Sequence, residues 1–134
     1  MGLVGLMNVL AVEGAKYNIK VNSIAPIAKT RLTEDLLGPL ADALAPEFVT
    51  PLVTYLVSER CELTHEIFDV GGGRYARVFI GMGKGWVAPG GKAPNAEAIF
   101  DHIDLIREQE GYSVPESIAD ETRAVVEALK AAQS

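Results

Sequence analysis

The stretch 19–34, IKVNSIAPIAKTRLTE, decides the fold that this sequence predicts. The apolar run Ile19–Ile24 predicts a buried β-strand that stops sharply at Pro26. An uninterrupted apolar strand between two helical segments is typical of a parallel sheet covered on both faces. In open α/β sheets, ligands bind just beyond the carboxyl ends of such strands. We therefore take the polar loop that follows as the candidate binding surface; it carries Lys29, Thr30, Arg31 and Thr33.

Helical patterns lie on both sides of this stretch. Met1–Lys16 has apolar residues around most of its circumference, which predicts a helix buried on two sides that ends at Gly14 and Asn18. No capping residue precedes it, so we expect this segment to be part of a longer helix and not the start of one. A second helix is predicted from Pro46 to Val57 and bent near Pro51, and a second strand at Glu66–Val70. Strand, helix and strand form one βαβ unit, in which the two strands are parallel.

The remainder predicts an extension of this unit. Tyr75–Met82 reads as a strand that turns at Gly83–Gly85 toward Trp86–Ala88, which makes a hairpin. A linker rich in glycine and proline, Pro89–Pro94, precedes two helices. Asn95 caps the first of them, and the second covers roughly Glu116–Ala132. We therefore expect an α/β domain over residues 1–88 and a linker with a helical extension over residues 89–134.

The formal net charge is −6, and its distribution excludes some classes of function. Residues 1–95 contain equal numbers of acidic and basic side chains, so the whole acidic excess lies in the tail. Without a basic stripe, nucleic acid is a poor candidate partner. No apolar run reaches membrane-spanning length, and the first residues lack the pattern of a signal peptide. The lone Cys61 favours a reducing compartment, and we expect the cytoplasm.

Three segments carry a resemblance to a known family: Val21–Pro26, Thr30–Thr33 and Asp69–Gly73. With them the chain resembles the C-terminal half of a short-chain dehydrogenase/reductase. It is most similar to the branch whose dehydrogenase domain oxidises (R)-3-hydroxyacyl-CoA. The resemblance implies a partial Rossmann-type fold with two parallel strands, a crossover helix and a C-terminal hairpin and helical extension.

The resemblance also implies roles for residues of the loop. Pro26 and Ile27 would offer backbone contacts to the nicotinamide end of NAD or NADP, although many relatives have glycine where Ile27 stands. Thr30 would offer its hydroxyl to the carboxamide or the pyrophosphate. Arg31, together with Lys29, is a candidate contact for a phosphate of the nucleotide or of coenzyme A. The segment 33–45 matches a mobile lid over the substrate, and the first helix matches a helix of a dimer interface.

Two motifs of the family are not found in these residues. No glycine-rich turn links a strand to a helix, which is how the family binds the pyrophosphate. No Tyr-x-x-x-Lys is present either; Tyr17 and Lys20 are one residue too close and fall where the helix ends. We therefore expect no catalytic residue in this chain and no dehydrogenase activity from it alone. His65 and His102 are too isolated to predict a metal site.

A sheet edge and an apolar helix without neighbours predict association. The expected partner is a second copy of the chain or a complementing N-terminal half, and the substrate of the parent enzyme is a small molecule or an acyl-CoA. Three interpretations stay open. The chain is a truncated or split oxidoreductase, a non-catalytic interaction module, or a remnant that binds acyl-CoA or nucleotide.

Overall fold

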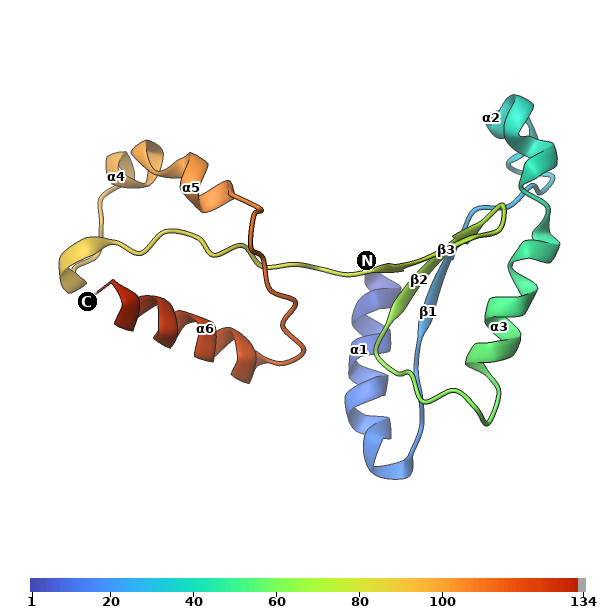
Figure 1. The fold of residues 1–134 in the computed structure, drawn as a ribbon, viewed down its shortest axis with the longest axis horizontal. Coiled ribbons are helices and arrows are strands. Elements are labelled where there is room, and N and C mark those ends of the chain that lie inside the picture. The colour runs from blue at the N-terminus through green and yellow to red at the C-terminus, as the bar shows by residue number, and fades with distance from the viewer. Residues whose placement is uncertain (133–134) are drawn as a thin grey trace. The chain divides into compact units, whose positions relative to one another are not determined.

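The computed structural model describes residues 1–132 and divides into two compact units, Met1–Phe79 and Ile80–Ser134 (Figure 1). Each unit is described by itself. The predicted domain boundary after residue 88 concerns the limit of the family domain and stays a prediction.

The first unit is built on a three-stranded sheet with the order β1-β2-β3. Strand β1 (Ser23–Pro26) pairs in parallel with β2 (Ile67–Gly71), and Ser23 lies opposite Ile67. Strand β3 (Arg74–Val78) pairs antiparallel with β2. The connection from β1 to β2 contains helix α3 (Thr50–Leu56), so the predicted βαβ unit with parallel strands is confirmed.

Strand β1 starts later than the predicted Ile19–Ile24. Before Ser23 the chain bonds to the loop ahead of β2: Val21 N donates to Thr64 Oγ1 and Val21 O accepts from His65 N. The prediction that this stretch is buried is wrong, because β1 is the edge of the sheet and Ile19 is 53% exposed. An edge position also explains how Pro26, which has no N–H, ends the strand without leaving a ladder bond unmade.

The hairpin forms at a different turn from the predicted one. Strands β2 and β3 are joined through Gly72 and Gly73, whose φ angles are +56° and +81°. Two successive left-handed residues make the tight turn that matches strand twist, and glycine adopts them without strain. The predicted hairpin at Gly83–Gly85 is wrong: Met82 instead forms an isolated antiparallel bridge with Ser113.

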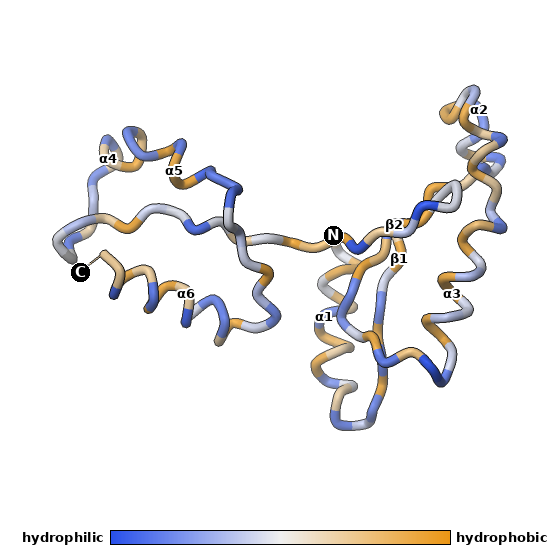
Figure 2. The backbone as a smooth tube through the Cα atoms, viewed as in Figure 1, coloured by the Kyte–Doolittle hydropathy of each residue, from blue (hydrophilic) through white to orange (hydrophobic). Residues whose placement is uncertain are grey.

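Helix α1 (Gly2–Gly14) continues into the 3-10 turn η1 (Ala15–Tyr17) and ends at Asn18, which is left-handed (φ 56°). The predicted end is therefore confirmed. The helix buries one stripe, namely Met7, Ala11 and Gly14. Burial on two sides is not observed, because apolar residues on its other faces are exposed, from 76% at Leu3 to 45% at Leu10. Figure 2 shows apolar residues on successive turns of α1.

Short helices form the connection that crosses from β1 to β2. They are α2 (Glu34–Leu37), η2 (Gly38–Ala43), η3 (Pro46–Phe48) and α3. Pro51 stands within the first two positions of α3, where the missing N–H leaves no bond unmade. Val57, the last residue of the predicted helix, lies just beyond the end of α3 and is 79% exposed. The fully buried side chain among the described residues is Val70, at the centre of the sheet.

The second unit contains the 3-10 turn η4 (Pro89–Gly91) and helices α4 (Ala96–Asp101), α5 (Ile103–Arg107) and α6 (Ile118–Ala131). Asn95 caps α4 as predicted, and its Oδ1 accepts from Ala98 N at 2.9 Å. His102 separates α4 from α5; its ring bonds Ala98 O at 2.8 Å and stacks on Trp86 with the ring centroids 4.1 Å apart.

Within residues 1–132, no single helix has the length and apolarity to cross a membrane. One pair, 34–43 with 46–56, meets that test by length and composition together but is bent by 66°.

Candidate functional site

The candidate site begins where β1 ends. Pro26 is the last residue of that strand and lies opposite Val70. The next residue, Ile27, donates its N–H to Val70 O at 2.8 Å, which extends the ladder by one bond before the chain turns into the loop. Both residues are exposed. They are therefore accessible at the carboxyl end of the strand, where the sequence placed them.

Gly71, at the end of β2, allows the loop to pass against the sheet. A Cβ atom at Gly71 would lie 2.6 Å from Ile27 O, closer than real Cβ atoms come to a carbonyl oxygen. A Cβ at Gly72 would meet Ala43 O at 3.2 Å. These two glycines thus let both the loop and the crossover pack against the hairpin turn, and Tyr75 adds a hydrogen bond to Phe48 O at 2.9 Å.

Thr33 organises the loop. Its Oγ1 donates to Ala28 O at 2.8 Å and accepts from Thr30 N at 2.8 Å. The hydroxyls of Thr30 and Thr33 lie 3.0 Å apart, and Thr30 Oγ1 also accepts from Leu32 N at 3.3 Å. Because the Thr33 proton points at Ala28 O, Thr30 is the donor between the two hydroxyls. A ligand would then meet Thr30 Oγ1 as a hydrogen-bond acceptor.

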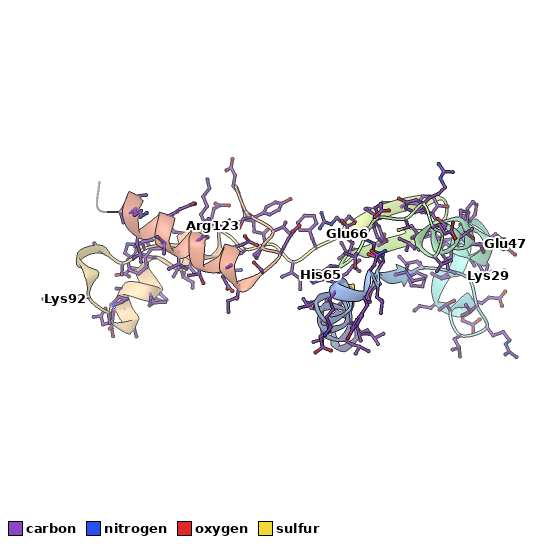
Figure 3. All side chains as sticks on the ribbon, turned by 90° about the horizontal axis from the view of Figure 1, so that it is seen from below. Lys29, Glu47, His65, Glu66, Lys92 and Arg123 are labelled. Atoms are coloured by element: carbon purple, nitrogen blue, oxygen red, sulfur yellow. The ribbon has the colours of Figure 1, made fainter. Side chains whose placement is uncertain are left out.

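Lys29 connects the loop to the segment after it. Its Nζ lies 3.1 Å from Asp42 Oδ1 and 3.2 Å from Glu34 Oε1, and its backbone N–H donates to Leu44 O at 2.7 Å. Figure 3 labels Lys29 in this region of the first unit. The hydrogen bond to Asp42, followed by the one to Glu34, raises the pKa of the Lys29 ammonium above its ordinary value.

Lys29, Glu34 and Asp42 help to line a pocket of about 420 Å³. It brings together two of the predicted residues, Thr30 and Arg31, but Pro26 and Ile27 do not line it. Arg31 makes no hydrogen bond or ion pair with any described residue, so its guanidinium is available to a ligand. The pocket is lined by Lys29, Thr30, Arg31, Glu34, Ala41, Asp42, Ala45 and Pro46.

Sequence reasoning missed the acidic side of this pocket. Glu34 follows the loop directly, but no pairing with Lys29 was predicted for it. Asp42 is 13 residues beyond Lys29, and no local pattern links the two. The close approach of Gly71 and Gly72 to the backbone of Ile27 and Ala43 was not predicted either. Among the described residues no cluster of three or more potential metal ligands is present.

The second unit has an apolar groove of about 740 Å³. It lies between the extended segment 82–88 and one face of α6, which contributes small and apolar side chains. Its charged lining residues are Lys84 and Glu127, and the larger apolar ones are Met82, Trp86, Val87, Val125 and Leu129. The groove therefore suits an apolar group of moderate size.

Sequence comparisons agree with this architecture. A short-chain type dehydrogenase/reductase of Mycobacterium tuberculosis is 54% identical over 81 residues, which are 60% of this chain and 28% of that protein. Peroxisomal multifunctional enzyme type 2 of Mus musculus is 38% identical over 131 residues, 96% of this chain and 18% of the enzyme. The chain thus spans less than a third of the length of these relatives. No family model matches it.

Solved structures also match the fold. Full-length peroxisomal multifunctional enzyme type 2 from Drosophila melanogaster superposes with a TM-score of 0.80 and 29% identity, over 97% of this chain and 24% of that one. A short chain dehydrogenase from Mycobacterium avium gives a TM-score of 0.56 and 30% identity, over 80% of this chain and 36% of that one.

The parallel strand pair with its crossover defines a partial Rossmann-type α/β protein. Together with the sequence matches, this shows that the chain is similar to part of a short-chain dehydrogenase/reductase.

Proposed function

We propose that this chain forms part of an NAD(P)-dependent oxidoreductase that interconverts a hydroxyl and a keto group. The observation that carries the proposal is the pocket at the carboxyl end of β1, where Thr30 and Arg31 lie together in a fold shared with dehydrogenases. Ligands of open α/β sheets bind at this end of the strands.

The residues of the pocket fit one part of a nicotinamide cofactor. Thr30 Oγ1, which is left as an acceptor, suits the N–H of a carboxamide, and Arg31 suits a phosphate oxygen. A pocket of about 420 Å³ admits one end of a dinucleotide. The cofactor, when bound, would supply the hydride acceptor. This chain's contribution is to position that end through Thr30, Arg31 and the backbone of Pro26 and Ile27.

Catalysis requires groups outside these 134 residues. The sequence contains neither the glycine-rich turn nor the Tyr-x-x-x-Lys that the family uses. Proton transfer to or from the hydroxyl oxygen needs such a positioned acid or base. We therefore expect hydride transfer only when another polypeptide segment supplies these motifs, as in a split or truncated enzyme.

The substrate class that we propose is a 3-hydroxyacyl-CoA. Relatives of this chain include an acetoacetyl-CoA reductase of Acinetobacter, 36% identical over 86 residues. The apolar groove of the second unit offers a surface for an acyl group, and Lys84 offers a cation beside it. The compartment stays a prediction: we expect the cytoplasm, whereas several relatives have peroxisomal in their names.

The test combines activity and binding. The purified chain, alone, should neither oxidise 3-hydroxybutyryl-CoA with NAD or NADP nor bind either cofactor with micromolar affinity in calorimetry. Addition of a segment of the Mycobacterium tuberculosis relative that carries both missing motifs should produce activity. In that complex, Arg31→Met should raise the KM for the cofactor about ten-fold, and Lys92→Met should not. Turnover by the chain alone would overturn the proposed division of labour.

A non-catalytic interaction module is the second candidate. The exposed apolar faces of α1 favour it, since contiguous apolar surface marks interaction sites. Association of the chain without any gain of activity in the complementation experiment would support this candidate over the first.

A further inference from the structure

Residues 34–43, which form α2 and η2 and are called the arm below, are attached to the first unit mainly at their two ends. At the start, Glu34 N donates to Thr30 O at 2.9 Å. After the end, Leu44 O accepts from Lys29 N at 2.7 Å. Both attachments involve the loop that follows β1, so the arm forms a closed excursion from that loop.

The middle of the arm packs little. Leu36 is 85% exposed and Leu40 is 65% exposed, whereas Ala41 is buried beside the pocket. Hydrophobic burial therefore contributes little to hold the arm in place. The charged side chains of the arm make two ion pairs, from Glu34 and from Asp42 to Lys29.

We propose that Lys29 is a positioning residue that holds the arm over the Thr30–Arg31 pocket. One ammonium group bonds carboxylates at both ends of the arm, Glu34 on α2 and Asp42 on η2. Breaking it releases two contacts at once. The inference deepens the proposed function, on which it rests for the identity of the ligand, because the arm and the pocket share these residues.

Arg31, the neighbouring cation, has a different role. Arg31 has no ion pair with a described residue and lines the pocket, so it is the group left to meet a ligand anion. Lys29 is already engaged by two carboxylates. We therefore assign to Lys29 the role of holding the arm and to Arg31 the recognition of an anion. The sequence alone had given both residues the same candidate role, contact with a phosphate.

Hydrogen exchange on the full chain, without any cofactor, tests the assignment. In Lys29→Met, amides of residues 34–43 should exchange roughly two- to thirty-fold faster than in the wild type, the range that two surface ion pairs produce. Lys29→Arg should restore slow exchange. Lys92→Met, which removes an exposed lysine that pairs with no described residue, is the matched control and should change nothing. Salt at 1 M, which shortens the screening length to about 3 Å and so weakens the two ion pairs, should have the same effect as Lys29→Met.

Amides of β2 serve as the internal reference. Faster exchange confined to the arm in Lys29→Met supports the proposed role of Lys29, whereas unchanged exchange in that variant overturns it. If Lys29→Met loosens β2 as well, Glu34→Gln with Asp42→Asn decides, because it removes both carboxylates and keeps Lys29: faster exchange of the arm alone supports the inference, and unchanged exchange overturns it. Since no cofactor is present, a failure of the complementing segment to produce activity would count against the proposed function and leave this result unaffected.

Discussion

At the scale of single residues, close backbone approach is the strongest constraint around the site. Gly71 lies so near Ile27 that a Cβ atom would be 2.6 Å from its carbonyl oxygen. The oxygen belongs to backbone and cannot rotate away. By contrast, a Cβ at Gly5 in α1 would meet nothing within 4 Å.

We predict opposite effects of alanine at these two positions. Gly71→Ala should lower the free energy of unfolding by about 1–3 kcal/mol, because the loop or the strand must shift. Gly5→Ala should raise it by roughly 0.5–1 kcal/mol, since alanine is the better helix former. Urea unfolding of both variants at one protein concentration measures the difference. Equal stability of Gly71→Ala and the wild type would contradict the close approach.

At the scale of elements, α6 shows how local chemistry starts a helix. Ser117 is its N-cap, and Ser117 Oγ donates to Asp120 Oδ2 at 2.9 Å. This hydrogen bond, with smaller contributions from Glu116 N and Arg123, lowers the pKa of the Asp120 carboxyl below its ordinary 3.8. An acidic group near a helix N-terminus also interacts favourably with the helix dipole.

The lowered pKa predicts the direction of an acid effect. Since the pKa of Asp120 is lower in the folded state than in the unfolded one, its stabilisation is present above the unfolded value. This stabilisation is lost as the pH falls through the pKa that Asp120 has in the folded state. We expect amides of the first turn of α6 to lose protection as the pH falls from the ordinary 3.8 toward the lower pKa of the folded state.

Hydrogen exchange measured across that pH range checks this expectation. Asp120→Asn should flatten the pH dependence of these amides. Glu121→Gln is the control and should retain the pH dependence, because the Glu121 carboxylate bonds no described residue. The same slope in Asp120→Asn and in the wild type would contradict the role of the cap.

At the scale of the whole molecule, exposed surface is the outstanding property. The chain exposes 10445 Å². A compact protein of this mass exposes about 6,800 Å², and even two separate globules sharing the mass would expose about 8,200 Å². The excess exceeds what a standard protein–protein interface buries, about 1,600 Å² for both partners together. The apolar faces of α1 contribute to it.

We therefore predict that the purified chain associates through α1. In sedimentation velocity the wild type should contain dimers or larger species at micromolar concentration. Leu3→Glu with Val12→Glu should shift it toward monomer, because both side chains are exposed and neither belongs to the buried stripe of α1. Leu32→Glu, at an isolated leucine that is 94% exposed, is the matched control. A monodisperse wild-type monomer would contradict the prediction.

Much of the architecture was predictable from sequence because its causes are local. The period of apolar residues predicted α1, and Asn18 and Asn95 marked a helix end and a helix start that the structure confirms. The order strand, helix, strand predicted the parallel pairing of β1 with β2. The site loop was also located correctly at the end of β1, and its contact with a cofactor stays a prediction.

Tertiary structure decided what depends on distant segments. Two glycine-containing stretches were able to turn a hairpin, and the one at Gly72 and Gly73 did so because the strand after it had β2 to pair with. Ile24 stayed partly exposed because no strand within the described residues pairs with the outer edge of β1. Lys29 met Asp42 only because the crossover returns to the loop. The sequence by itself thus determined which elements form, through periodicity and capping. Burial and charge pairing depend on tertiary contacts between segments that are far apart along the chain, so only the tertiary structure decided them.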